Sequence, residues 1–379
     1  MRVDVRPGMI RWARDRAGLP RPALLKRFPR LEAWEEGSVS PTLKQLEGFA
    51  RAVWVPVGYL FLPEPPAEAM PIPDFRVGRA RAERPSPHLL DTVYLCQARQ
   101  AWYADYARTA GEPARAFVGS VTTNTPVETA AAAMRDVLGF QMEARRGCST
   151  WADALRQFIA QAEAAGTLVM CSGVVENNTR RKLDPDEFRG FAIADPLAPL
   201  VFINGADTKS AQMFTLAHEL AHIWLGASAL TDADASWTME EEIEGWCNRV
   251  AAELLVPMSA VRLELKSWEP VAREMQRLAR VFKVSTLVVL RRMFDAGALP
   301  KDEFHVEYEA ELRRLAELPK RSGGDFYLSQ PARASRRFVT ALVESTLEGR
   351  TLYRDALRML GIKKMETFHE LGRAVEAIV

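Results

Sequence analysis

The sequence HELAH at residues 218–222 constrains this chain more than any other feature. Two histidines four residues apart lie on one face of a helix, one turn from each other. The surrounding residues are mostly apolar and predict a buried helix over residues 208–226. Bare imidazoles are costly to bury there, and this spacing lets two histidines share one Zn²⁺ ion. The segment therefore predicts a zinc site at His218 and His222.

The glutamate beside the first histidine suggests hydrolytic chemistry. Glu219 directly follows His218 and is expected to point toward the space beside the metal. A carboxylate in that position can take a proton from water that zinc has activated. We therefore predict Glu219 as a general base and Zn²⁺ as the cofactor, with Mn²⁺ as a substitute in vitro.

A catalytic zinc needs a third protein ligand, and no histidine follows closely enough to supply it. The candidates are glutamates at the start of a second helix, expected over residues 239–256: Glu240, Glu241, Glu242 and Glu244. At about 100° per residue, Glu244 and Glu240 fall on or beside the apolar face, while the other two turn toward solvent. Glu244 is favoured and Glu240 is the alternative. Asn248, one turn after Glu244, could hydrogen-bond the second nitrogen of a ligand histidine.

Composition limits the class of protein. A chain of 379 residues predicts two or three domains, and a hydrophobic content of 48% is enough to build buried cores. The net charge of +1 argues against binding polyanions by bulk charge. Four scattered cysteines without a CxxC pair argue against a disulfide framework or a cysteine-ligated zinc. With no signal-like leader and no apolar run of about 18 residues, we expect a cytoplasmic protein that does not enter a membrane.

The first 30 residues are locally basic. Nine basic residues stand against two acidic ones there, an excess of seven positive charges. Such a surface could face phosphate groups. The candidate DNA-contacting residues are Arg11, Arg14, Arg21, Lys26, Arg27 and Arg30.

Residues 214–222 read FTLAHELAH, and residues 244–257 read EGWCNRVAAELLVP. With the apolar segments 188–193 and 199–204, they resemble the ImmA/IrrE family of zinc metallopeptidases over roughly residues 155–260. In that family a similar strand pair precedes the zinc helix. The resemblance implies that His218, His222 and Glu244 hold zinc and that Glu219 is the base.

Residues 9–62 resemble a helix-turn-helix module of the XRE type. The matching features include Trp34-Glu35 and the segment 40–43, which predicts a helix cap and start. The interval from Gly18 to Trp34 is about four residues shorter than in the usual module, at the turn and recognition helix. Two interpretations therefore stay open: a DNA-binding domain, or a packing and docking domain that no longer reads DNA.

These observations predict an α+β, mostly helical protein with four parts. The parts are a helix-turn-helix bundle at residues 1–62, a proline-rich linker at 63–84, a zincin-like metallopeptidase domain at 85–299 and a helical C-terminal region at 300–379. Residues 85–150 are expected to be a helical lead-in to the third part. Strands are expected over 166–175 and within 188–203, and one long helix over 268–298. The segment 188–194 is expected at an open sheet edge, where an extended substrate could add as a strand.

The expected function is a regulatory zinc endopeptidase. The family resemblance implies a protein substrate such as a helix-turn-helix repressor or an antitoxin-like regulator, with links to transcription control, toxin–antitoxin systems and stress response. The alternative is a DNA-binding autoregulator or antitoxin in which the zincin fold is mainly a scaffold for protein binding. A homodimer is compatible with either hypothesis.

Overall fold

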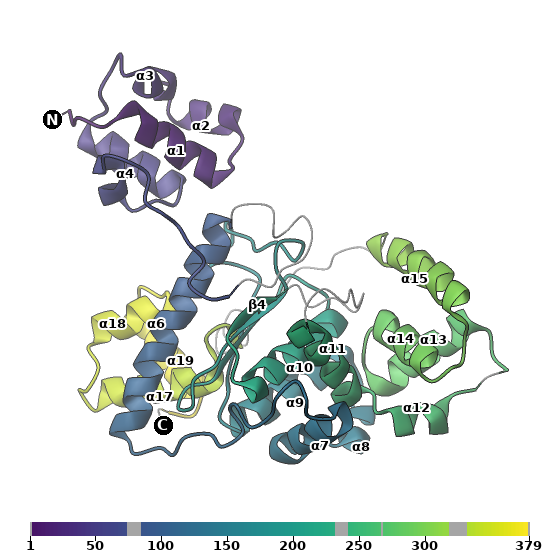
Figure 1. Cartoon of the computed structure of the whole chain (residues 1–379). Helices are drawn as coiled ribbons and strands as arrows, with labels where there is room; N and C mark the ends of the chain where they lie inside the picture. Colours follow the sequence, from purple (N-terminus) through teal and green to yellow (C-terminus); the bar gives the residue numbers. More distant parts are fainter. Residues whose placement is uncertain (1, 74–84, 232–241, 267, 318–331, 378–379) are drawn as a thin grey trace. The chain divides into compact units, whose positions relative to one another are not determined.

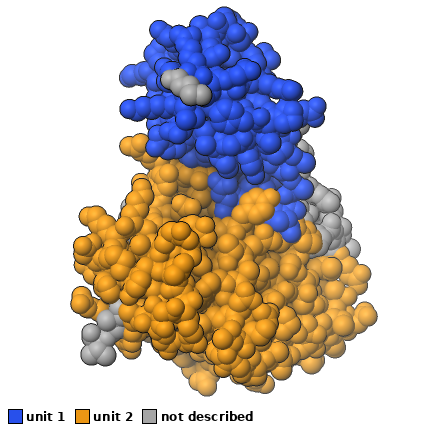
Figure 2. Space-filling view, turned by 90° about the vertical axis from the view of Figure 1, so that its left-hand side faces the viewer, with its two compact units in different colours: residues 1–71, 84–91 blue, residues 72–83, 92–379 orange. Residues whose placement is uncertain are grey.

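The computed structural model describes residues 2–73, 85–231, 242–266, 268–317 and 332–377 (Figure 1). The chain divides into two compact units, which Figure 2 shows in different colours. One unit comprises residues 1–71 and 84–91, and the other comprises residues 72–83 and 92–379. Among the helices in the described stretches, none combines the length and apolar composition that a membrane span requires.

The N-terminal unit is a small helical bundle. Its elements are α1 (Pro7–Ala17), α2 (Arg21–Arg27), α3 (Leu31–Glu36), α4 (Leu43–Ala52) and the 3-10 helix η1 (Val57–Phe61). Thr42 caps α4 in a capping box with Gln45, which confirms the helix start predicted for residues 40–43. The rings of Phe28, Trp34 and Phe49 pack together with centroids 5.7–6.3 Å apart. The helical character of this region is thus confirmed, while its identity as a helix-turn-helix stays a prediction.

The second unit contains a four-stranded sheet in the order β1-β3-β2-β4. The strands are β1 (Leu168–Ser172), β2 (Gly190–Ile193), β3 (Leu200–Asn204) and β4 (Ala229–Thr231). β1 runs parallel to β3, and β2 runs antiparallel to both β3 and β4. All residues of β2 and β3 are buried, as their continuous apolar sequences indicate. The mostly helical α+β class with a small sheet is confirmed.

The prediction of an open edge at residues 188–194 is wrong. β2 lies inside the sheet, because β4 pairs with it on the side away from β3. β4 has three residues, too few to show the alternating pattern by which a strand is recognised in a sequence. Among the described residues the edges of the sheet are β1 and β4.

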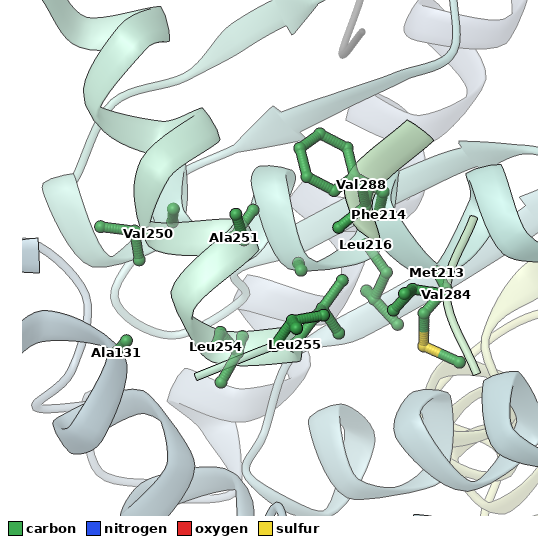
Figure 3. Close-up of a cluster of buried hydrophobic side chains, with 14 of the residues drawn as sticks. Ala131, Met213, Phe214, Leu216, Val250, Ala251, Leu254, Leu255, Val284 and Val288 are labelled. Carbon is green, nitrogen blue, oxygen red and sulfur yellow. The ribbon is translucent and has the colours of Figure 1, made fainter. Parts of the chain in front are cut away.

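Two helices form the centre of this unit. Thr208 caps α10 (Lys209–Leu225) by accepting from the Ala211 amide, and Gly226 ends it in the left-handed conformation, with φ of 72°. All residues from 212 to 224 are buried, so α10 is covered on every side. Helix α11 (Glu242–Leu255) packs beside it. Figure 3 shows apolar side chains of both helices in one buried cluster.

Other helices of the second unit flank this centre. They are α7 (Val127–Leu138), α8 (Met142–Arg146), α9 (Trp151–Ala164), α12 (Met258–Glu264), α13 (Val271–Phe282), α14 (Thr286–Asp295) and α15 (Lys301–Ala316). The prediction of one helix over 268–298 is wrong. Lys283 takes a left-handed φ of 53° and ends α13, and Ser285 then caps α14. The apolar pattern hides this break because both helices contribute to the same buried cluster.

The C-terminal helices belong to the same unit as the sheet. They are α17 (Arg336–Leu347), α18 (Tyr353–Leu360) and α19 (Met365–Ala374). Arg99, on α6 (Pro87–Thr109), is buried and donates hydrogen bonds of 2.8 and 2.9 Å to the Met359 carbonyl. The Ser335 hydroxyl donates to the Glu163 carboxylate. Specific polar contacts therefore fasten this region, which the sequence predicts only as helical.

Candidate metal centre

Helix α10 places two imidazoles next to each other. His218 and His222 have Nε2 atoms 3.1 Å apart and ring centroids 4.9 Å apart. Both side chains are fully buried. The predicted one-turn spacing on a continuous helix is confirmed, and the two nitrogens face the same space.

Glu244 completes the cluster from the first turn of α11. Its carboxylate oxygens lie 3.1 Å from Nε2 of His218 and 3.0 Å from Nε2 of His222. One candidate ligand atom from each of the three residues lies within 4.8 Å of the others. Residues that are more than 20 positions apart in the sequence therefore converge on one point.

Of the other three candidate glutamates, Glu242 alone lies within the described residues. Glu242 is exposed, as its position on the helix predicts. Glu240 and Glu241 lie outside the described residues. The alternative of Glu240 as a ligand thus stays a prediction, while Glu244 is the glutamate found beside the histidines.

The donor atoms of this cluster fit a divalent metal. Two imidazole nitrogens and one carboxylate oxygen are the ligand types of catalytic zinc sites, which keep a further position for water or substrate. The cluster lies among apolar side chains of α10 and α11, where unliganded polar groups are costly. His218, His222 and Glu244 would hold the metal.

The charges of the cluster also favour a cation. Burial lowers the pKa of His218, but the Glu244 and Glu219 carboxylates outweigh burial and raise this pKa overall. Burial lowers the pKa of His222, and the neighbouring His218 lowers it further; Glu244 raises this pKa without reversing the overall lowering. Burial raises the pKa of Glu244, yet the two imidazoles hold it well below its usual range. A carboxylate whose pKa is lowered therefore faces the two imidazole Nε2 atoms.

Asn248 lies one turn after Glu244 and is buried. Burial lowers the pKa of His218, and the carboxylates of Glu244 and Glu219 raise it. The side chain of Asn248 also raises this pKa, by a smaller amount. Within the described part of the chain, neither Nδ1 of His218 nor Oδ1 of Asn248 has a partner at hydrogen-bonding geometry. Asn248 is thus close to the histidine it was predicted to orient, and the orienting hydrogen bond stays a prediction.

Glu219 is fully buried and lies against the start of β2. A Cβ atom added to Gly190 would lie 2.9 Å from Oε1 of Glu219 and 2.5 Å from Cγ2 of Thr215. Any side chain at position 190 would therefore collide with Thr215 and with Glu219, the expected base. Sequence reasoning missed this residue, although an isolated glycine within an apolar strand is a signal of close approach.

Substituting Gly190 by alanine should impair both stability and catalysis. We expect the free energy of unfolding to fall by roughly 1–3 kcal/mol, the usual cost of overpacking. Peptidase activity should fall while bound metal is retained, because the new methyl group displaces Glu219 and no candidate ligand. Denaturant unfolding, metal analysis and a cleavage assay measure the three effects. Gly8→Ala is the control, since a Cβ there meets no atom within 4 Å; full activity of Gly190→Ala would contradict the close approach.

Two of the six candidate DNA-contacting residues are paired with carboxylates. Arg14 forms ion pairs with Asp15 and Glu35, and Arg21, which is exposed, pairs with Glu32 and Glu35. The other four candidates are also exposed: Arg11, Lys26, Arg27 and Arg30. Acidic residues just beyond position 30 thus neutralise part of the predicted positive surface.

The metal cluster falls within a segment that has recognised relatives. Residues 162–294 match the family model described as the IrrE N-terminal-like domain of the M78 peptidases. The matched segment is therefore similar to this domain, and we call it the IrrE-like domain. It contains His218, Glu219, His222 and Glu244, and it includes the whole sheet. Residues 334–374, which include all of α17–α19, match a domain of unknown function (DUF8813).

Two curated relatives match the chain over part of their length. The radiation response metalloprotease IrrE of Deinococcus radiodurans is 33% identical over 111 residues, which cover 28% of this chain and 34% of the relative. The protein of the same name from Deinococcus deserti is 34% identical over 111 residues, which cover 28% of this chain and 40% of the relative. The chain thus matches less than half of the length of either relative.

Proposed function

We propose that this chain is a zinc-dependent regulatory endopeptidase that cuts another protein. The observation that carries this proposal is the convergence of His218, His222 and Glu244 on one point, with the buried Glu219 alongside. The IrrE-like domain supports the metallopeptidase class. The nitrogen and oxygen donors favour Zn²⁺, with Mn²⁺ as a substitute in vitro.

The residues of the site have distinct roles in this proposal. When bound, the metal would polarise the scissile carbonyl and lower the pKa of the attacking water. Glu219 accepts the proton of that water and returns it to the leaving amine. The missing side chain of Gly190 leaves the Glu219 carboxylate the space that it occupies. Asn248 is a positioning residue that orients the His218 ring.

We place the substrate among regulators of gene expression. Both curated relatives are named for a radiation response, which supports a role in stress response for this chain. A helix-turn-helix repressor or an antitoxin-like regulator is the substrate class that would link hydrolysis to transcription control. A homodimer is compatible with this role.

A cleavage assay tests the proposal directly. The purified protein is incubated with Zn²⁺ or Mn²⁺ and with helix-turn-helix regulators encoded near its gene, and products are identified by mass spectrometry. We expect a defined cleavage that a chelator abolishes and that added metal restores. No cleavage with either metal would contradict the peptidase and favour the scaffold alternative.

The exposed basic residues support a second candidate, a DNA-binding autoregulator in which the zincin fold serves as a scaffold. The residues concerned are Arg11, Lys26, Arg27 and Arg30. Contacts with phosphates release counterions, so affinity for the upstream promoter should fall steeply as salt rises, and alanine at these positions should flatten that slope. A gel shift measures both effects, and absence of binding at low salt would favour the docking interpretation of this unit.

A further inference from the structure

The outer edge of β4 already has an occupant from the same chain. The Leu230 amide donates a 2.8 Å hydrogen bond to the carbonyl of Pro73. Successive amides of a strand point to opposite sides, so the Leu230 amide is directed away from β2. Residues 72 and 73 thus lie along the side of β4 on which a further strand would add.

The residues at this edge have the features of an extended ligand. Ile72 is 6% exposed, whereas its neighbours Pro71 and Pro73 are exposed. A residue before proline favours the extended conformation, and proline supplies a carbonyl acceptor without an amide donor. One apolar anchor combined with a main-chain hydrogen bond to a sheet edge is the mode by which extended peptides add to sheets.

This edge is close to the expected catalytic base. β4 pairs with β2, and its register sets residue 231 opposite Gly190. Gly190 in turn approaches Glu219 so closely that an added Cβ would lie 2.9 Å from Oε1. A strand added to the outer edge of β4 would therefore lie two strand spacings, each about 4.8 Å, from β2, whose Gly190 approaches Glu219.

We propose that the outer edge of β4 binds the protein substrate as an extended strand, and that Ile72–Pro73 is the internal occupant which substrate displaces. The substrate role rests on the proposed peptidase function. Edge protection against aggregation is the competing explanation, and it predicts no competition with an incoming peptide. Among the described residues, this segment reaches the edge through one main-chain hydrogen bond, and the adjoining Ile72 is buried. An incoming strand with several hydrogen bonds can replace that contact.

Binding is tested apart from cleavage, in the Glu219→Gln background. Fluorescein-labelled casein serves as an unfolded protein probe, and its Kd is measured by fluorescence anisotropy. Adding Ile72→Ser should lower this Kd by about two- to tenfold, the range expected for loss of one competing hydrogen bond with its anchor. Ile72→Val, which keeps the anchor, and Ala69→Ser, at an exposed position of the same segment, should leave the Kd unchanged.

Hydrogen exchange of the Leu230 amide provides the second measurement. Ile72→Ser should speed its exchange, and saturating casein should slow it again, because the added strand then accepts its hydrogen bond. Unchanged or weaker casein binding by Ile72→Ser, or exchange that stays fast with casein bound, would overturn the inference. Ile72→Ala serves as the milder variant should the serine variant unfold. Cleavage by the wild-type protein is scored separately, so loss of the peptidase hypothesis and loss of this inference give different results.

Discussion

Replacing Glu219 with glutamine is expected to slow peptide-bond hydrolysis by about 10²- to 10⁴-fold, the contribution typical of a general base. The amide keeps the shape of the side chain but cannot take a proton from water. Glu219 is outside the three-residue cluster, so the variant should bind as much metal as the wild-type protein. Steady-state cleavage and metal analysis of the same preparation measure the two quantities.

Glu242→Gln is the matched control for this substitution. Glu242 is exposed on α11 and also carries a carboxylate, so its loss should leave both hydrolysis and metal content unchanged. Wild-type hydrolysis by the Glu219 variant would exclude this residue as the base. Loss of metal along with hydrolysis would instead make Glu219 part of the binding site.

Replacing Glu244 with glutamine is expected to weaken metal binding by more than about 100-fold. Residues that hydrogen-bond a metal ligand without touching the metal already contribute about 10–100-fold to metal affinity. A direct ligand should contribute more. The substitution removes the carboxylate that lies 3.0–3.1 Å from both Nε2 atoms. Hydrolysis should therefore be lost together with the metal, unlike the outcome expected for Glu219.

Competition with a chromogenic chelator measures the metal affinity of this variant. His218→Ala should give the same loss, because it removes another member of the cluster. Glu242→Gln again serves as the control, since it lies two residues away on the same helix and faces solvent. One equivalent of tightly held metal in the Glu244 variant would show that another group, such as Glu240, is the third ligand.

The local parts of the site could be read from the sequence. Four-residue spacing puts His218 and His222 on one helical face whatever surrounds the helix. The apolar stripe of the next helix likewise separates Glu244 from Glu242, and the structure has the first near the histidines and the second exposed. Periodicity failed at Lys283, because an apolar pattern does not show a single left-handed residue between two helices that share a core.

The sequence by itself predicted the two histidines, the candidate base and the helices that carry them, with Glu244 favoured over Glu240 as third ligand, because each prediction depends on spacing along one element. Only the tertiary structure decided that β2 is interior, that Gly190 abuts Glu219 and that Pro73 reaches the edge of β4. It also decided that Arg14 and Arg21 are partly neutralised by carboxylates further along the chain. These features arise from contacts between segments that are far apart in the sequence. Such contacts produce no periodic pattern in the sequence of either segment.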